Sequence, residues 1–307
     1  MRFQPPTGLA DPARIRLAGC PRFLAFGDRG CHPRKNRSTA LEPFHPGSFR
    51  ARSIKLFLLV LAAILSLAIP IPATAADLPA PVAASRQRVQ AADFRASGHL
   101  VLVDADGKRV SDGITLKARW FPGVLRVLVE ITSPAEARAH ILLEMHPNGQ
   151  NVIQIAHPGD KTPSILPFDK WTDGPLGPGF SYEDFLEAQY FWPSQTVVEE
   201  TKYGTRDCDL LKSLPGSADR THYSEVKSWL DHGISFPVYV EKTLKGSGAV
   251  KEFTYFGLRH DGGVWSASQL EVKTRGKTGS TLLIIDRGSP KANLSLGDFS
   301  PEQLIRF

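Results

Sequence analysis

Three acidic residues close together, Glu183, Asp184 and Glu187, have the types and spacing that could support chemistry. On one face of a helix, two carboxyl groups could serve as the proton donor and acceptor of a hydrolase. The same segment, however, begins with Ser181 followed by an acidic residue three positions later, which is a helix-start signal. Acidic side chains near a helix start are stabilised by the helix dipole. We therefore interpret the three carboxylates as a solvated helix face.

Signatures of other catalytic and metal sites are incomplete. Gly246–Gly248 reads Gly-Ser-Gly but lies in a turn between strands, whereas a nucleophile elbow joins a strand to a helix. Gly276–Thr278 resembles the end of a phosphate-binding loop, but the first glycine of that motif is missing. The histidines after residue 75 lack metal-ligand spacing, and His140 and His146 are out of phase with their apolar neighbours and should face solvent. We expect neither a catalytic residue nor a bound metal or cofactor.

The charge of the chain is unevenly distributed along its 307 residues. The formal net charge is +6, from 37 basic and 31 acidic side chains. Residues 1–52 hold ten of the basic and three of the acidic residues, whereas residues 76–307 hold 26 basic and 28 acidic ones. The basic excess therefore belongs to the first sixth of the chain, and the remainder is nearly neutral. For this reason we expect no nucleic-acid partner.

An apolar run near residue 60 has the features of a secretory signal peptide. Leu56–Ile69 contains no charged residue, follows Arg50, Arg52 and Lys55, and is followed by Ala73–Ala75, which reads Ala-Thr-Ala. A membrane-spanning helix needs about 20 apolar residues, so this run is short for one. We predict export to the periplasm with cleavage after the last of these alanines. An uncleaved anchor or a buried helix is the alternative.

These features divide the chain into four parts. Residues 1–52 are rich in Pro and Arg and lack apolar periodicity, so we expect either a disordered extension or residues upstream of the true translation start. Residues 53–75 form the signal peptide, and residues 76–95 are expected to be a linker. Residues 96–307 then form the folded domain.

The domain reads as an antiparallel sheet with short helices. Residues 114–121 and 139–145 alternate apolar and polar side chains, as strands with one buried face do. Asp106-Gly107, Pro122-Gly123 and Asn148-Gly149 are turn signals between such segments, so consecutive strands should pair. We expect ten to twelve strands, a helix over 182–191 and a short final helix from Pro301. A sheet of this size must close as a barrel or have its concave face covered.

The expected helix over 182–191 is unusually aromatic, and it follows a loop, residues 158–181, that is rich in Pro and Gly. Aromatic side chains dominate protein cores, so this helix could pack permanently on one face of the sheet. It could instead act as a movable lid over an apolar cavity, because the preceding loop offers freedom to move. Both interpretations place the aromatic side chains against the sheet.

Several segments, in their order along the chain, resemble the outer-membrane lipoprotein-sorting proteins, the LolA-like periplasmic lipoprotein carriers. The resemblance covers roughly residues 95–307. The segments that carry it are Gly179–Trp192 (GFSYEDFLEAQYFW), Tyr223–Leu230 (YSEVKSWL), Phe236–Lys242 (FPVYVEK), Val250–Gly257 (VKEFTYFG), Ser280–Asp286 (STLLIID) and Leu296–Ser300.

This resemblance implies a mainly β fold with a few helices, in which a large curved antiparallel sheet forms an incomplete (half) β-barrel covered by an α-helical lid. It implies an apolar cavity for lipid or lipoprotein acyl chains, no catalytic residue and no cofactor. The implied partners are these acyl chains together with the inner- and outer-membrane lipoprotein machinery. The aromatic and apolar residues that we expect to line the cavity or the lid are Trp120, Phe180, Tyr182, Phe185, Leu186, Tyr190, Phe191, Trp192, Trp229 and Trp265.

Three functions follow as hypotheses. The first is a non-catalytic periplasmic carrier that binds acyl chains and sorts them toward the outer membrane. The second is a lipid-sensing or interaction module on the same fold that regulates a partner protein. The third is a secreted hydrolase, which the missing nucleophile signatures disfavour.

Overall fold

The computed structural model describes residues 78–176 and 179–307. The predicted extension over 1–52, the signal peptide over 53–75 and the cleavage point after Ala75 lie outside the described residues. Among the helices that are described, none is long and apolar enough to cross a membrane.

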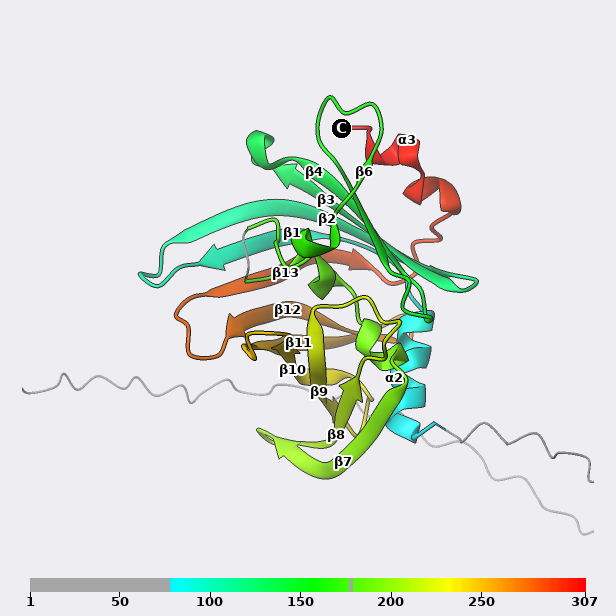
Figure 1. Ribbon diagram of the computed structural model, residues 1–307, viewed down its shortest axis with the longest axis vertical. Coiled ribbons are helices and arrows are strands. Elements are labelled where there is room, and N and C mark those ends of the chain that lie inside the picture. The colour runs from blue at the N-terminus through cyan, green and yellow to red at the C-terminus, as the bar shows by residue number, and fades with distance from the viewer. Residues whose placement is uncertain (1–77, 177–178) are drawn as a thin grey trace, which may run out of the picture. The chain divides into compact units, whose positions relative to one another are not determined.

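The strands of the described part form one antiparallel sheet of 13 strands, in the order β6-β5-β4-β3-β2-β1-β13-β12-β11-β10-β9-β8-β7 (Figure 1). Their bounds are β1 (Asp93–Val103), β2 (Arg109–Phe121), β3 (Val124–Ser133), β4 (Ala139–Met145), β5 (Val152–Ala156), β6 (Ser164–Ile165), β7 (Ser194–Tyr203), β8 (Arg206–Leu214), β9 (Tyr223–Asp231), β10 (Pro237–Leu244), β11 (Val250–Asp261), β12 (Val264–Thr274) and β13 (Ser280–Ser289). The sheet is unclosed, with β6 and β7 at its edges. The predicted large antiparallel sheet is therefore confirmed, with somewhat more strands than expected.

Neighbouring strands in the sheet are mostly neighbours in sequence, because tight turns join them. Gly107 and Gly123 have φ values of 81° and 80°, which the turns before β2 and β3 require and which glycine adopts without strain. The exception is the centre of the sheet, where β1 pairs with β2 on one side and with β13 on the other. The first and last strands thus join two halves, β1–β6 and β7–β13.

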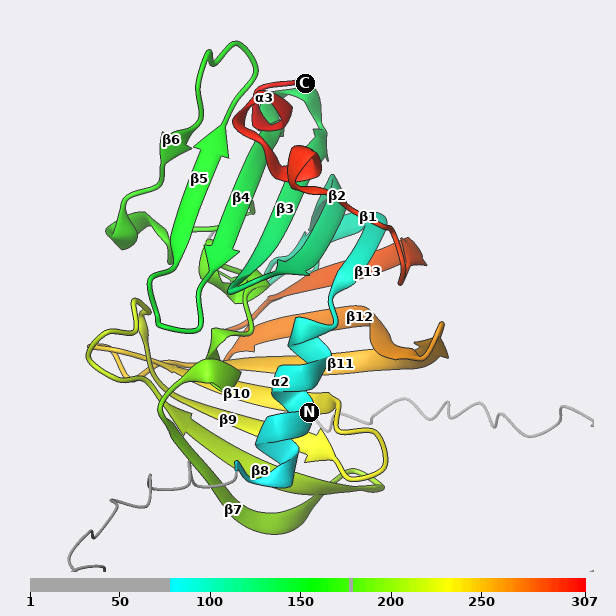
Figure 2. The same cartoon turned by 90° about the vertical axis from the view of Figure 1, so that its right-hand side faces the viewer.

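The inner face of the sheet, as we call it, carries the main apolar core. It is continuous across both halves, because one apolar cluster includes side chains of both. Along most strands the buried side chains alternate with more exposed ones. Representative members are Leu116, Val129, Leu143, Leu211, Leu230, Val240 and Phe253. Helix α2 (Ala80–Gln90) crosses the strands of the second half, as Figure 2 shows. Two short 3₁₀ turns, η3 (Tyr182–Phe185) and η4 (Ala188–Phe191), complete what we call the cover, which is α2 together with residues 180–192.

Residues 76–95 differ from the predicted linker. The structure has α2 and the beginning of β1 in this segment. Val82, Ser85 and Val89, spaced three and four residues apart, are the buried residues of the helix, and the two valines join the core. With only two apolar anchors in eleven residues, the helical periodicity is too weak to be recognised from the sequence.

The continuous helix predicted over 182–191 is wrong. After η3, Leu186 adopts an extended conformation, with φ −106° and ψ 140°, and the chain turns again at η4. The predicted capping box at Ser181 and Asp184 is present and starts η3. The break allows side chains on all sides of the segment to reach the core, which one straight helix could not do.

The outer face of the first half is covered by the C-terminal segment. A 3₁₀ turn, η5 (Leu296–Phe299), and helix α3 (Pro301–Leu304) pack on β3–β5, and the predicted final helix at Pro301 is confirmed. The buried members of this cluster are Leu128, Leu142, Ala156, Leu294, Phe299 and Leu304. The remaining short elements are the 3₁₀ turns η1 (Ala135–Ala137) and η2 (Phe168–Lys170).

His140 was expected to face solvent, and the structure corrects this. Its ring is 7% exposed, and Nδ1 lies 2.9 Å from the carbonyl oxygen of Leu304. The ring stacks on Phe307 with a centroid distance of 4.1 Å. His140 does point away from the inner face, but α3 and the residues after it cover that side of the strand.

Candidate functional site

The interior between the cover and the inner face is dominated by aromatic side chains. Residues 166–176 and 179–192 pack on both halves of the sheet. Trp171, Phe180, Tyr190 and Trp192 on this segment are each at most 3% exposed. The predicted aromatic cluster is thus placed against the sheet by the short turns that interrupt the expected helix.

Eight of the ten predicted lining residues come together in this interior. Trp120 from β2 stacks on Phe191 with a centroid distance of 5.5 Å, and Phe180 meets Phe185 edge-on at 4.7 Å. The others, Tyr182, Leu186, Tyr190 and Trp192, pack into the same apolar clusters.

The structure does not bring Trp229 and Trp265 into this group. Trp229 pairs with Tyr239 across β9 and β10, on the side opposite to the buried Val240, and their rings lie 5.0 Å apart. Trp265 on β12 lies against His260 of β11, at a centroid distance of 4.9 Å. Alternation along a strand decides these positions, and a tryptophan is compatible with either face.

Part of the apolar inner face is incompletely covered. Leu283 and Ile285 on β13, Leu270 on β12 and Tyr255 on β11 pack on the core but remain half-buried. Phe94 on β1 pairs with the buried Ala118 of β2, so its side chain is on the inner face, and it is 37% exposed. These side chains form an apolar rim at the centre of the sheet.

The interior beneath the cover is filled by the protein's own side chains. A cavity of about 20 Å³ lies between the cover and β9, next to Trp171, Leu186, Trp192 and Val226. A space of that size holds about one water molecule. An acyl chain could therefore enter this interior only if the cover moved away from the sheet.

A buried ionic cluster fixes the beginning of the cover. The Asp184 side chain is fully buried, with Oδ2 2.9 Å from Nζ of Lys251 and Oδ1 3.2 Å from Nζ of Lys242. The hydroxyl of Tyr223 donates a hydrogen bond to Oδ1 at 2.5 Å, and that of Ser181 donates to Oδ2 at 2.7 Å. Residues from η3, β9, β10 and β11 thus meet at one carboxylate.

This cluster corrects the solvated helix face that the sequence suggested. Burial alone would raise the pKa of Asp184, but the ammonium groups of Lys251 and Lys242 outweigh burial and hold that pKa well below its usual range. Glu183 is also buried, with Oε2 3.3 Å from Nδ1 of His222. Since these acidic groups are engaged with bases, the structure supports a role in stability for them.

The other end of the cover is held by arginines of α2. Arg88 donates two hydrogen bonds of 2.8 Å to Glu187, one to each carboxylate oxygen, and its guanidinium lies 5.1 Å from the ring centre of Phe236. Arg86 Nε donates to the carbonyl oxygen of Tyr190 at 2.7 Å. Burial and the Glu187 carboxylate raise the pKa of Tyr190 to about 12. The sequence did not point to either arginine, because the helix α2 that carries them was not predicted.

We searched the described residues for a metal site and for a free carboxylate among the acidic residues of η3. They include no group of three or more His, Cys, Asp or Glu side chains arranged to hold a metal. Asp184, which the sequence pairs with Glu183 and Glu187, has its two oxygens bound by lysines, Tyr223 and Ser181. What the arrangement can do is shield apolar surface from water.

Solved structures with the same fold include three bacterial proteins. A putative outer membrane lipoprotein-sorting protein domain from Vibrio parahaemolyticus has a TM-score of 0.66 and 20% identity, over 73% of this chain and 97% of its own. A DUF1329 family protein from Desulfovibrio piger gives 0.66 and 15%, over 73% and 96%. A LolA superfamily protein from Nitrosomonas europaea gives 0.56 and 14%, over 72% and 98%. At these identities the likeness concerns the fold.

A protein-family model matches residues 124–306, which is more than half of the chain, and its description reads "uncharacterized protein". The chain belongs to this family. None of the curated proteins matches it. The LolA-like fold is therefore confirmed, and its fold relatives include a lipoprotein-sorting domain.

Proposed function

We propose that the protein is a non-catalytic periplasmic carrier that binds lipid or lipoprotein acyl chains and sorts them toward the outer membrane. The observation that carries the proposal is the apolar inner face of an unclosed LolA-like sheet. The cover that packs on this face consists of one helix and two short turns. The proposed ligand contacts are Trp120, Phe180, Tyr182, Phe185, Leu186, Tyr190, Phe191 and Trp192, with the rim residues Leu283 and Ile285.

The energetics of transfer favour such a carrier. Burying an acyl chain gains about 0.8 kcal/mol per CH₂, so a chain of about 16 carbons gains on the order of 12 kcal/mol. This gain can offset the loss of the contacts that hold the cover against the sheet. The aromatic side chains of the cover would then pack on the ligand where they now pack on strands.

The polar groups of the interior support an apolar ligand. The Asp184 carboxylate and the Lys242 and Lys251 ammonium groups bind one another and are buried, so they are not exposed to a headgroup. The half-buried rim, in contrast, consists of Leu, Ile, Phe and Tyr side chains. Export to the periplasm is the remaining part of the proposal and rests on the predicted signal peptide.

Lipid mass spectrometry of the protein purified from its own periplasm tests this function. We expect a co-purifying acyl lipid, and we expect protein stripped with mild detergent to bind a fluorescent fatty acid again. If neither the lipid nor the rebinding is found, the carrier function is wrong.

A charge on the rim should prevent acyl binding. We predict that Ile285→Glu weakens fluorescent fatty acid binding at least about tenfold, because a carboxylate would have to be desolvated by the ligand. The matched control is Ile165→Glu on β6, where the isoleucine is 68% exposed and lies at the sheet edge. Equal binding by the two variants, with both folded by circular dichroism, would exclude this rim as the ligand site.

A further inference from the structure

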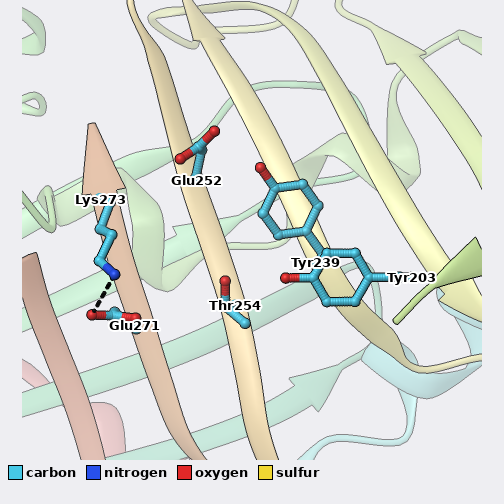
Figure 3. Close-up of a pocket in the computed structure, with 6 residues that line it drawn as sticks. All are labelled: Tyr203, Tyr239, Glu252, Thr254, Glu271 and Lys273. Carbon is cyan, nitrogen blue, oxygen red and sulfur yellow. Dashed lines mark ion pairs between the residues drawn. The ribbon is translucent and has the colours of Figure 1, made fainter. Parts of the chain in front are cut away.

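A second hollow lies on the outer face of the other half of the sheet, away from the cover. Its volume is about 350 Å³, and its lining residues are Tyr203, Tyr239, Glu252, Thr254, Glu271 and Lys273. Figure 3 shows these side chains over β10, β11 and β12, with the Tyr203 ring beside that of Tyr239. The volume is at the lower end of small-molecule sites, which are about 300–1,000 Å³.

Strand register explains why the surface is hollow here. Tyr239, Thr254 and Glu271 lie opposite one another on three adjacent strands, so they form one row across the sheet. The short Thr254 side chain stands between two longer ones and forms the floor. Glu252 and Lys273, opposite each other in the next row, form one border. The hollow therefore follows from side-chain lengths in a regular sheet.

The aromatic side of the hollow is held in place. Tyr203 and Tyr239 stack with centroids 4.8 Å apart and planes at 11°, and Trp229 meets Tyr239 at 5.0 Å. These rings come from β7, β10 and β9, and Tyr203 and Tyr239 remain half-buried, so ring surface reaches solvent. A flat ligand could therefore lie against a preorganised aromatic surface.

The charged side chains of the hollow are paired within the protein. Nζ of Lys273 lies 3.1 Å from Glu271, and Nε of Arg275 lies 2.7 Å from Glu252. Arg275 also pairs with Glu241, which lies outside the lining. The oxygen and nitrogen atoms of these ion pairs still accept and donate hydrogen bonds. The hydroxyl of Thr254 can do both.

We propose that this hollow binds a neutral saccharide. A sugar ring has a face of C–H groups, which packs on an aromatic ring, and a rim of hydroxyls, which bind paired carboxylates, ammonium groups and a threonine hydroxyl. A saccharide therefore matches both the aromatic and the polar side of the hollow. An organic cation would have to compete with Lys273 and Arg275 for Glu271 and Glu252, which are both paired.

Titration by ¹H–¹⁵N NMR tests the site, with cellobiose and chitobiose as probes and choline chloride as the cationic probe. The full chain is used. We expect shifts of the Thr254 and Tyr239 amides with either disaccharide, at a dissociation constant of about 1 mM for so shallow a site. Choline should leave these amides unchanged.

Two variants separate the hollow from the rest of the outer face. Tyr203→Ala removes the aromatic wall and should weaken disaccharide binding at least about tenfold. Phe256→Ala removes another exposed aromatic of β11, outside the lining, and should bind as the unmodified protein does. Fatty acid binding serves as a folding control, since the proposed acyl site is on the opposite face and should be unaffected by either variant.

The proposal is overturned by any of three results. Neither disaccharide shifts the amides, choline shifts them instead, or Tyr203→Ala binds as tightly as Phe256→Ala. None of these outcomes bears on the carrier function, because that function is measured with a different ligand on the inner face.

Discussion

Two buried lysines face each other across neighbouring strands beneath the cover, and they require a carboxylate as counter-charge. Lys242 on β10 pairs directly with Lys251 on β11, and like charges in that position destabilise a sheet. Their positions were visible in the sequence, because Lys242 follows Val238 and Val240 on the apolar face. The compensating carboxylate was not, since Asp184 lies 58 residues before Lys242 and reads as a helix-start residue. Alternation thus locates buried bases but cannot identify their distant partner.

Removing the charge of Asp184 should destabilise the fold. We predict that Asp184→Asn lowers the free energy of unfolding by about 3–5 kcal/mol, because two buried ammonium groups lose their counter-charge. Urea denaturation at pH 7 measures this. The matched control is Asp298→Asn, which occupies the same position in the capping box of η5 but has only an exposed ion pair, with Arg95 at 3.5 Å, and should cost about 1 kcal/mol. Equal losses in the two variants would contradict the role of the lysines.

The same carboxylate gives stability a defined pH dependence. The pKa of Asp184 is lowered in the folded state. Its contribution to the free energy of unfolding is therefore complete above the pKa of this carboxyl in the unfolded chain, about 4. The contribution is lost as the pH falls from there toward the folded-state pKa, since the unfolded state takes up the proton first. When the pH is lowered from neutral to below about 4, the free energy of unfolding should therefore fall less in Asp184→Asn than in the unmodified protein.

At the scale of elements, the cover is the part that sequence patterns describe least well. Most strands were found because apolar residues alternate over five or more positions and turns separate them, whereas the two-residue β6 lies in the segment expected to be a loop. The cover, in contrast, is built from an eleven-residue helix with two apolar anchors and from two single turns. Such elements owe their conformation to tertiary contacts, chiefly those of Arg88, Arg86 and Asp184, and these are invisible to periodicity.

The two ends of the cover should differ in how readily they open. We predict that Arg88→Met, which keeps the apolar stem but removes both hydrogen bonds to Glu187, increases hydrogen exchange in α2 and η4. Exchange in η3 should change little, because Asp184 still holds it. Hydrogen exchange with mass spectrometry reports each segment. Arg126→Met is the control, since it breaks an ion pair with Glu144 between β3 and β4. Unchanged exchange in α2 would show that Arg88 does not hold it.

At the scale of the whole unit, two different segments cover parts of the sheet, one on each face. The cover packs on the inner face, and the C-terminal segment packs on the outer face of β3–β5. The resemblance in the sequence predicted the sheet and an inner covering. It gave no indication of the outer one, because strands buried on both faces, such as β4, differ from half-buried ones only in having fewer polar residues.

The outer covering should contribute measurably to stability. We predict that Phe299→Ala lowers the free energy of unfolding by about 3–5 kcal/mol, because the ring is 1% exposed and packs edge-on against Phe121. Leu296→Ala in the same turn should change it by less than about 0.5 kcal/mol, since that leucine is 57% exposed. Thermal denaturation compares them, and a similar midpoint for both variants would mean that the segment is only loosely attached.

The pairing of β1 with β13 has a consequence for how the protein is made. Arg95 pairs with Ser289, so the centre of the sheet joins residues synthesised almost at opposite ends of the domain. Hairpins on either side can form from local contacts, but the central ladder must wait for the last strand. Until then β1 and β12 both present an unpaired edge, which invites association between incomplete chains. A chaperone that binds extended segments would therefore be most useful until β13 (Ser280–Ser289) is available to pair with β1 and β12.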